Sequence, residues 1–147
     1  MRINKIEDLD EVLQVSEEVF EPNFQEKEKY HKKSDWLEKI KNGLLISAVS
    51  NNQIVGFAIC CKKETAFHIW NVGVLTKYRK IGIWQRMYKE IIKFAKDSGY
   101  RQVSLNTYKE KFPPMYKFCK KEKFIEKSIE VDPFSGYVKS MFIKQIV

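Results

Sequence analysis

A short basic segment, at the point where an apolar run ends and a helical pattern begins, carries the strongest chemical signal in the sequence. The apolar run ends at Val74, three basic residues follow (Lys77, Arg79 and Lys80), and Gly82 opens the helix. The first N–H groups of a helix have no partner inside it, and the helix dipole adds partial positive charge there. Such a turn is suited to bind a phosphate or pyrophosphate, although an ordinary turn with solvated lysines is the alternative. The segment is neither a Walker loop nor a GxGxxG dinucleotide fingerprint.

Hydrophobic periodicity predicts the elements that position this segment. We expect strands at 2–6, 44–49, 53–60, 65–75, 101–108, 123–131 and 137–146, and helices at 7–20, 25–41, 82–96 and 113–122. Strand 65–75, helix 82–96 and strand 101–108 form a βαβ crossover, so these two strands are parallel within an otherwise antiparallel arrangement. The predicted fold is a single α/β domain over residues 1–147. Its mixed, mostly antiparallel central sheet has six to seven strands, with helices on both faces.

The basic segment resembles the signature of the GCN5-related N-acetyltransferases (GNAT). In that family a strand ends in valine, and Arg/Gln-x-x-Gly-x-Gly/Ala then opens a helix. Here the matching residues are Arg79 and Gly82, whereas Trp84 stands at the second Gly/Ala position. The order of elements fits the family over nearly the whole chain. Lys121-Glu-Lys123-Phe124 lies where the family has Lys-x-Gly-Phe, with Lys123 in place of the glycine.

The resemblance implies transfer of an acetyl (acyl) group from acetyl-CoA, the co-substrate, to a primary amine by direct attack. The pyrophosphate of the co-substrate would lie on the amides of the turn. The pantetheine arm would pair with the end of strand 65–75, where that strand diverges from strand 101–108, and the N–H of Val74 would stabilise the oxyanion. Trp84 requires either that its ring points away from the phosphates or that the co-substrate shifts. The residues implied to bind acetyl-CoA are Val74, Arg79, Lys80, Ile81, Gly82, Ile83 and Trp84.

The implied reaction includes two proton transfers, and each needs a group that accepts or donates the proton. His68 lies six residues before Val74, where histone-modifying members of the family commonly have a glutamate, and a histidine can relay the proton of the amine. The alternative is that His68 only packs in the sheet. For the leaving thiolate the family offers a tyrosine five residues before the phenylalanine that matches Phe124, but Cys119 occupies that position. Tyr116 lies one helical turn earlier, so Tyr116, Cys119 and solvent all remain candidate proton donors.

Charge and composition leave two rival interpretations. The net charge is +8, and residues 1–28 are acidic, so the remaining 119 residues carry +14. A basic nucleic-acid-binding module is one rival, but the lysines are scattered and no known nucleic-acid-binding motif accompanies them. A GNAT-like domain that binds acyl-CoA without turnover, as a sensor or partner domain, is the other. The substitutions at Trp84, Cys119 and Lys123 favour it.

Several classes of protein and site are excluded or disfavoured. Three cysteines and two histidines, without CxxC or HxxxH spacing, predict neither a disulfide framework nor a metal site. No apolar run is long enough to span a bilayer, and the first residues do not resemble a signal peptide. We therefore expect a cytoplasmic enzyme that acts on a small-molecule or peptide amine, with no membrane partner and no nucleic acid. The acceptor and a homodimeric state remain open.

Overall fold

Seven strands form one sheet in the order β1-β2-β3-β4-β5-β7-β6. The computed structural model describes residues 1–20, 33–133 and 135–147. Neighbouring strands are antiparallel except for β4 and β5, which are parallel. The strands are β1 (Arg2–Ile3), β2 (Leu44–Ser50), β3 (Gln53–Lys63), β4 (Ala66–Val74), β5 (Gln102–Tyr108), β6 (Ile125–Val131) and β7 (Val138–Gln145). The predicted mixed sheet and its βαβ crossover are confirmed.

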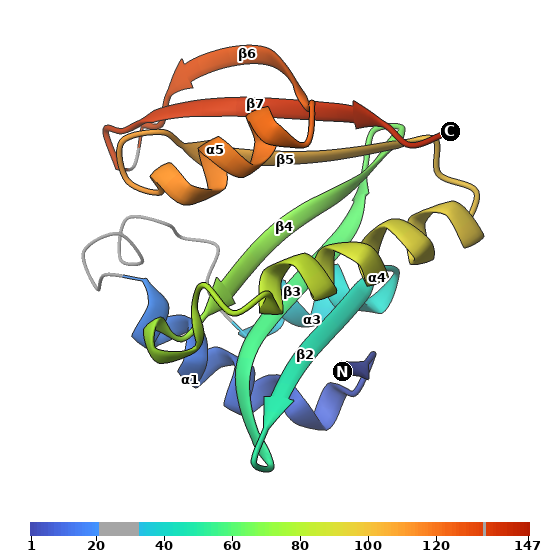
Figure 1. Ribbon diagram of the computed structural model, residues 1–147. Coiled ribbons are helices and arrows are strands. Elements are labelled where there is room, and N and C mark those ends of the chain that lie inside the picture. Colours follow the sequence, from blue (N-terminus) through green and yellow to red (C-terminus); the bar gives the residue numbers. More distant parts are fainter. Residues whose placement is uncertain (21–32, 134) are drawn as a thin grey trace.

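Helices cover both faces of the sheet, as predicted (Figure 1). Their bounds are α1 (Leu9–Val19), α3 (Lys33–Lys41), α4 (Ile83–Asp97) and α5 (Pro113–Lys121), with short 3-10 turns η1 (Ile6–Asp8) and η2 (Thr76–Tyr78). One buried cluster joins α1 and α3 to β2 and β3, and the other joins α4 and α5 to the opposite face. We call these faces the α1 face and the α4 face. The part of the predicted helix 25–41 that precedes Lys33 lies outside the described residues.

The first strand is shorter than predicted, and the reason lies at Asn4. This residue adopts a positive φ of 55°, which turns the chain out of the extended conformation. Its backbone N–H donates to the carbonyl oxygen of Leu45, at 2.7 Å, and its side-chain oxygen accepts from the N–H of Leu45, at 3.0 Å. The predicted strand 2–6 therefore ends at Ile3, and a 3-10 turn leads into α1.

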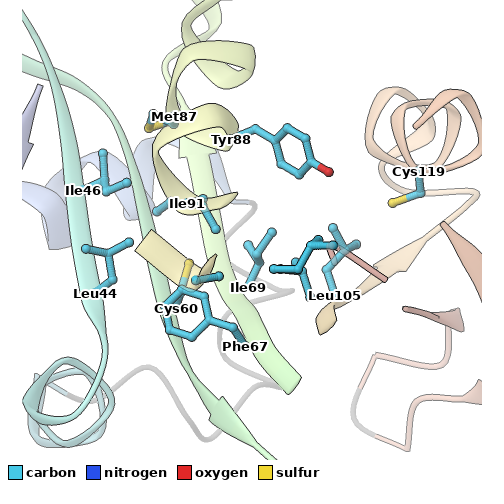
Figure 2. Packing of buried hydrophobic residues seen from close by; sticks show 14 of the residues in the cluster. Leu44, Ile46, Cys60, Phe67, Ile69, Met87, Tyr88, Ile91, Leu105 and Cys119 are labelled. Carbon is cyan, nitrogen blue, oxygen red and sulfur yellow. The ribbon is translucent and has the colours of Figure 1, made fainter. Parts of the chain in front are cut away.

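The α4 face holds the larger core. The helical spacing of Met87, Ile91 and Ala95 buries one side of α4. Figure 2 shows Ile91 between Leu44 of β2 and Ile69 of β4. Burying aliphatic side chains of this size contributes roughly 1.5–3 kcal/mol each. This packing holds α4, and hence the turn at its N-terminus, firmly against β4.

Strands β4 and β5 pair over only three residues and then diverge. Their register joins Phe67, His68 and Ile69 to Val103, Ser104 and Leu105, although both strands continue further. Trp70 is an extra residue in β4, because the pairing with β3 shifts between Ile59 and Cys60. In Figure 1 the two strands lie close together near the C-terminus and separate toward the N-terminal end of α4.

The chain reversal after α5 has a strained residue where the family has glycine. Lys123 has a φ of 63°, and its N–H donates to the carbonyl oxygen of Lys120, at 3.1 Å. A left-handed conformation costs a non-glycine residue about 1–2 kcal/mol, part of which glycine loses again in chain entropy. We expect Lys123→Gly to raise the free energy of unfolding by about 0.5–1 kcal/mol, measured by urea denaturation. The control is Lys117→Gly, at an exposed position within α5, which should lower it by about 1 kcal/mol. Equal losses in both variants would contradict this explanation.

Candidate active site

A cavity of about 1080 Å³ lies where β4 and β5 diverge. At one end it is lined by the turn before α4. We call this the turn half, formed by residues 72–74, 78–80 and 82–85, whereas the exposed Ile81 does not line the cavity. At the other end it is lined by charged and aromatic side chains from α3, β3, β4, β5 and β7 and from the segment after β5. We call this the lysine half, formed by Asp35, Glu38, Lys39, Cys61, Lys62, Lys63, His68, Trp70, Tyr108, Lys111 and Lys139.

The turn half is built to leave backbone N–H groups open. Lys80 and Gly82 both have positive φ, of 65° and 88°. Gly82 is the N-cap of α4 and offers no side chain to the first turn, so the N–H groups of that turn have no intrahelical partner. A Cβ built on Gly82 would have no atom within 4 Å. The helix terminus predicted from the sequence is therefore open and electropositive, as an anion site needs to be.

Arg79 ties the turn to the end of β4. Its Nε donates a hydrogen bond to the carbonyl oxygen of Val74, at 2.8 Å, although the side chain is otherwise exposed. The bond joins two residues five positions apart and closes the loop around η2. Arg79 therefore fixes the turn relative to the strand edge, in addition to placing its charge beside the open amides.

The backbone of Val74 faces the gap between the diverging strands. Leu75 donates its N–H to the carbonyl oxygen of Val55 on β3, at 2.9 Å. In an antiparallel ladder the hydrogen-bonded pairs alternate, so the N–H and C=O of Val72 and Val74 point away from β3. The Val74 carbonyl accepting from Arg79 agrees with this direction. The N–H of Val74 is therefore directed into the cavity, as an oxyanion donor needs to be.

Trp84, the main departure from the family signature, packs toward α5. Its ring lies 5.2 Å from that of Phe118 and 5.7 Å from that of Tyr88, both measured between centroids. Its indole N–H is buried without a partner among the described residues. The ring thus occupies the α4–α5 contact, which leaves the backbone amide at the helix terminus accessible.

His68 lies buried in the lysine half, on the α1 face of β4. Its Nδ1 is 2.8 Å from the Oγ of Ser104 on β5. Burial, and then the positive charges of Lys63, Lys39 and Lys139, lower its pKa to about 3. The imidazole is therefore neutral at physiological pH. Accepting a proton from an ammonium group of pKa about 10.4 is unfavourable by about 7 units, or roughly 10 kcal/mol.

The two candidate proton donors on α5 do not line the cavity. Tyr116 packs its ring on Phe142 of β7, at 5.5 Å between centroids. Cys119 is fully buried, and burial raises the pKa of its thiol to about 12. The α5 residues that do line the cavity are Pro114, Met115 and Phe118.

Sequence reasoning missed Tyr108, which lines the cavity at the end of β5. The parity of that strand could have placed it there.

Neither a metal site nor a membrane-crossing helix is found in the described ranges. Within residues 1–20, 33–133 and 135–147, no group of three or more His, Cys, Asp and Glu side chains could hold a metal ion. None of the helices described there has both the length and the apolarity needed to cross a bilayer.

The chain is similar to known acetyltransferases in sequence and in fold. Residues 9–124 match the acetyltransferase (GNAT) family. A comparison with curated proteins found no match. Among solved structures, aminoglycoside 6'-acetyltransferase type Ii superposes with a TM-score of 0.78 at 16% identity, covering 100% of this chain and 98% of that one.

Two further structures were solved with the co-substrate or its product. PaiA N-acetyltransferase from Thermoplasma acidophilum, in complex with coenzyme A, has a TM-score of 0.74 at 17% identity and covers 99% of both chains. A GNAT family acetyltransferase from Elizabethkingia anophelis, with acetyl-CoA bound, has a TM-score of 0.65 at 20% identity, covering 78% of this chain and 83% of that one. The match over residues 9–124, on this fold and with this open helix terminus, shows that the chain belongs to the GNAT family of acetyl-CoA-dependent N-acetyltransferases.

Proposed function

We propose that this N-acetyltransferase binds acetyl-CoA along the turn half of the cavity and its amine acceptor in the lysine half, within one catalytic domain over residues 1–147. The observation that carries the proposal is that an uncapped helix terminus and the outward-facing backbone of Val72 and Val74 line the same cavity. Acetyl-CoA supplies the activated acetyl thioester. Arg79, Lys80 and the amides of Ile81 to Trp84 then hold the pyrophosphate, and the strand edge of β4 pairs with the pantetheine arm.

The amine is proposed to attack the thioester directly, without an acetylated enzyme. The N–H of Val74 stabilises the oxyanion that forms. An amine has to be neutral to attack, and a pocket lined by lysines lowers the pKa of an ammonium group, because like charges disfavour its charged form. His68, held by Ser104, is proposed to accept a hydrogen bond from the amine, or from a water beside it, and the proton that the nitrogen loses passes through water to solvent. The proton relay predicted for His68 from the sequence is thus proposed here as hydrogen bonding alone.

Protonation of the leaving thiolate is assigned to a hydroxyl on the cavity wall. Tyr108 lines the cavity and carries a hydroxyl that can donate a proton, whereas Tyr116 and Cys119 do not line it. We expect Tyr108→Phe to lower kcat about tenfold with little change in the KM for acetyl-CoA, measured by thiol release.

Two further variants test the donors predicted from the sequence. Tyr116→Phe should change kcat less than twofold. Cys119→Ala should also keep kcat within twofold while lowering the free energy of unfolding by about 1 kcal/mol, because it removes a buried sulfur from the core. A larger loss of kcat in Tyr116→Phe or Cys119→Ala than in Tyr108→Phe would return the role to α5. Unchanged kcat in all three variants would assign the protonation to solvent.

The cellular setting is proposed from the cysteines. Cys60, Cys61 and Cys119 are all free and buried. Buried free thiols are typical of a reducing compartment, so we propose that the enzyme works in the cytoplasm.

A further inference from the structure

The lysine half of the cavity carries more positive than negative charge. Its described lining includes five lysines and two acids, the acids being Asp35 and Glu38 on α3. Lys139 has an ion pair with Glu130, at 3.1 Å, and Lys39 lies over the ring of Trp70, at 5.7 Å from its centroid. Glu130 does not line the cavity, whereas Lys139 does.

Three of these lysines come from three different elements, and all of them affect His68. Lys39 lies on α3, Lys63 at the end of β3 and Lys139 near the start of β7. His68 is buried, and all three lysines disfavour its charged form. An ammonium group placed near His68 would meet the same repulsion.

A cavity with this charge disfavours acceptors that carry only amines. Aminoglycosides and polyamines bear several ammonium groups, and each additional one would be repelled by the lysines. An acceptor with an anionic group near its amine avoids this penalty, because the lysines bind the anion and the anion offsets their repulsion of the amine.

We propose that the acceptor of this enzyme is an amine that also carries an anionic group, a carboxylate or a phosphate, which is bound by Lys39, Lys63 and Lys139 in the lysine half of the cavity. This proposal rests on the proposed function, because it assigns the acceptor of the same site. The shared chemistry is an anion a few bonds away from a primary amine. The structures that resemble this chain share its fold and carry no information about its acceptor.

Matched pairs of acceptors test the proposal. The pairs are O-phosphoethanolamine with ethanolamine, and β-alanine with β-alaninamide, and 1,3-diaminopropane is a dication of similar length. We expect kcat/KM, from thiol release, to be at least tenfold higher for the anionic member of at least one pair and lowest for the diamine. A preference in the first pair alone identifies phosphate, and one in the second pair alone identifies carboxylate. Equal or higher kcat/KM for the neutral amines or the diamine would overturn the proposal.

Variants that change the charge of single lysines test whether these lysines bind the anionic group of the acceptor. Lys63→Glu and Lys139→Gln should each lower kcat/KM for the preferred anionic acceptor at least tenfold, with the KM for acetyl-CoA within twofold of wild type. Lys127→Glu makes the same charge change as Lys63→Glu at an exposed position of β6 outside the cavity, and it should have no effect. Anionic selectivity that persists in both lysine variants would overturn the assignment.

Binding separates a failure of this proposal from a failure of the proposed function. If no amine is acetylated, the proposed function fails, but calorimetry on the protein saturated with coenzyme A still compares O-phosphoethanolamine with ethanolamine. At least tenfold tighter binding of O-phosphoethanolamine supports the anionic site. Equal binding of the two compounds overturns it.

Discussion

Gly82→Val is expected to raise the Kd for acetyl-CoA at least 100-fold, which corresponds to about 2.7 kcal/mol of lost binding free energy. Gly82 lines the cavity at the N-terminus of α4, where no protein atom lies within 4 Å of the position that a Cβ would take. A valine there would project into the space that the pyrophosphate needs to reach the open amides. It would also resist the φ of 88° that directs those amides.

Gly99→Val is the matched control for this prediction. Gly99 has a φ of 87°, and no atom lies within 4 Å of its Cβ position either, but it ends α4 and does not line the cavity. Both variants carry the same kind of backbone strain, about 1–2 kcal/mol, and should melt at similarly lowered temperatures. Only Gly82→Val should lose acetyl-CoA binding, as measured by calorimetry. Equal Kd values in the two variants would show that the phosphate site lies elsewhere.

The stability of the protein is expected to fall with acidification because of His68, the second large effect. Its pKa is about 3 in the folded protein, against about 6.5 when unfolded. Between these values the unfolded chain binds one more proton, so stability rises with pH through this window and the loss begins as pH falls below 6.5. The slope is about 1.36 kcal/mol per pH unit, which gives roughly 2 kcal/mol of lost stability at pH 5.

His68→Gln isolates that contribution. Urea denaturation of wild type and variant from pH 5 to 8 should give a difference in unfolding free energy that is constant above pH 7 and shifts by about 2 kcal/mol, in favour of the variant, at pH 5. The carboxylates are common to both proteins and cancel in the difference. A difference that does not change with pH would mean that His68 titrates normally in the fold.

The pH dependence of kcat/KM should differ from the one expected from the sequence. A histidine of ordinary pKa would produce an inflection in kcat/KM near pH 6.5, whereas a histidine that stays neutral produces none there. The lysines that contribute to this shift come from α3, β3 and β7. Residues so distant in sequence are brought together only by the tertiary fold, so no local pattern around His68 could have predicted its pKa.

The conformation of the turn before α4, in contrast, could be predicted because its parts are contiguous. The end of β4, the basic turn and the glycine that caps α4 lie within nine residues, and their geometry follows from local conformational preferences. The divergence of β4 from β5 also followed from the resemblance, while the extra residue at Trp70 did not, since nothing in the apolar pattern distinguishes a bulge from regular strand.

The sequence alone could not predict which side chains of α5 face the cavity. Counting along α5 placed Tyr116 and Cys119 as candidates, but which side of a short helix faces a cavity depends on how its aromatic residues pack. Phe118 fits against Tyr88 and Trp84 of α4, and Tyr116 against Phe142 of β7. These contacts orient α5 so that Cys119 enters the core (Figure 2) and Tyr116 lies behind the cavity wall.

Turnover itself tests the central claim most directly. The purified protein is mixed with acetyl-CoA, first alone and then with the acceptor panel, and both the released thiol and the masses of protein and amine are measured. Direct acetyl transfer predicts unmodified protein before the amine is added, and afterwards one acetylated amine for each thiol released. Acetyl-CoA that binds but releases no thiol with any amine, or an acetylated protein that forms before the amine is added, would contradict the account.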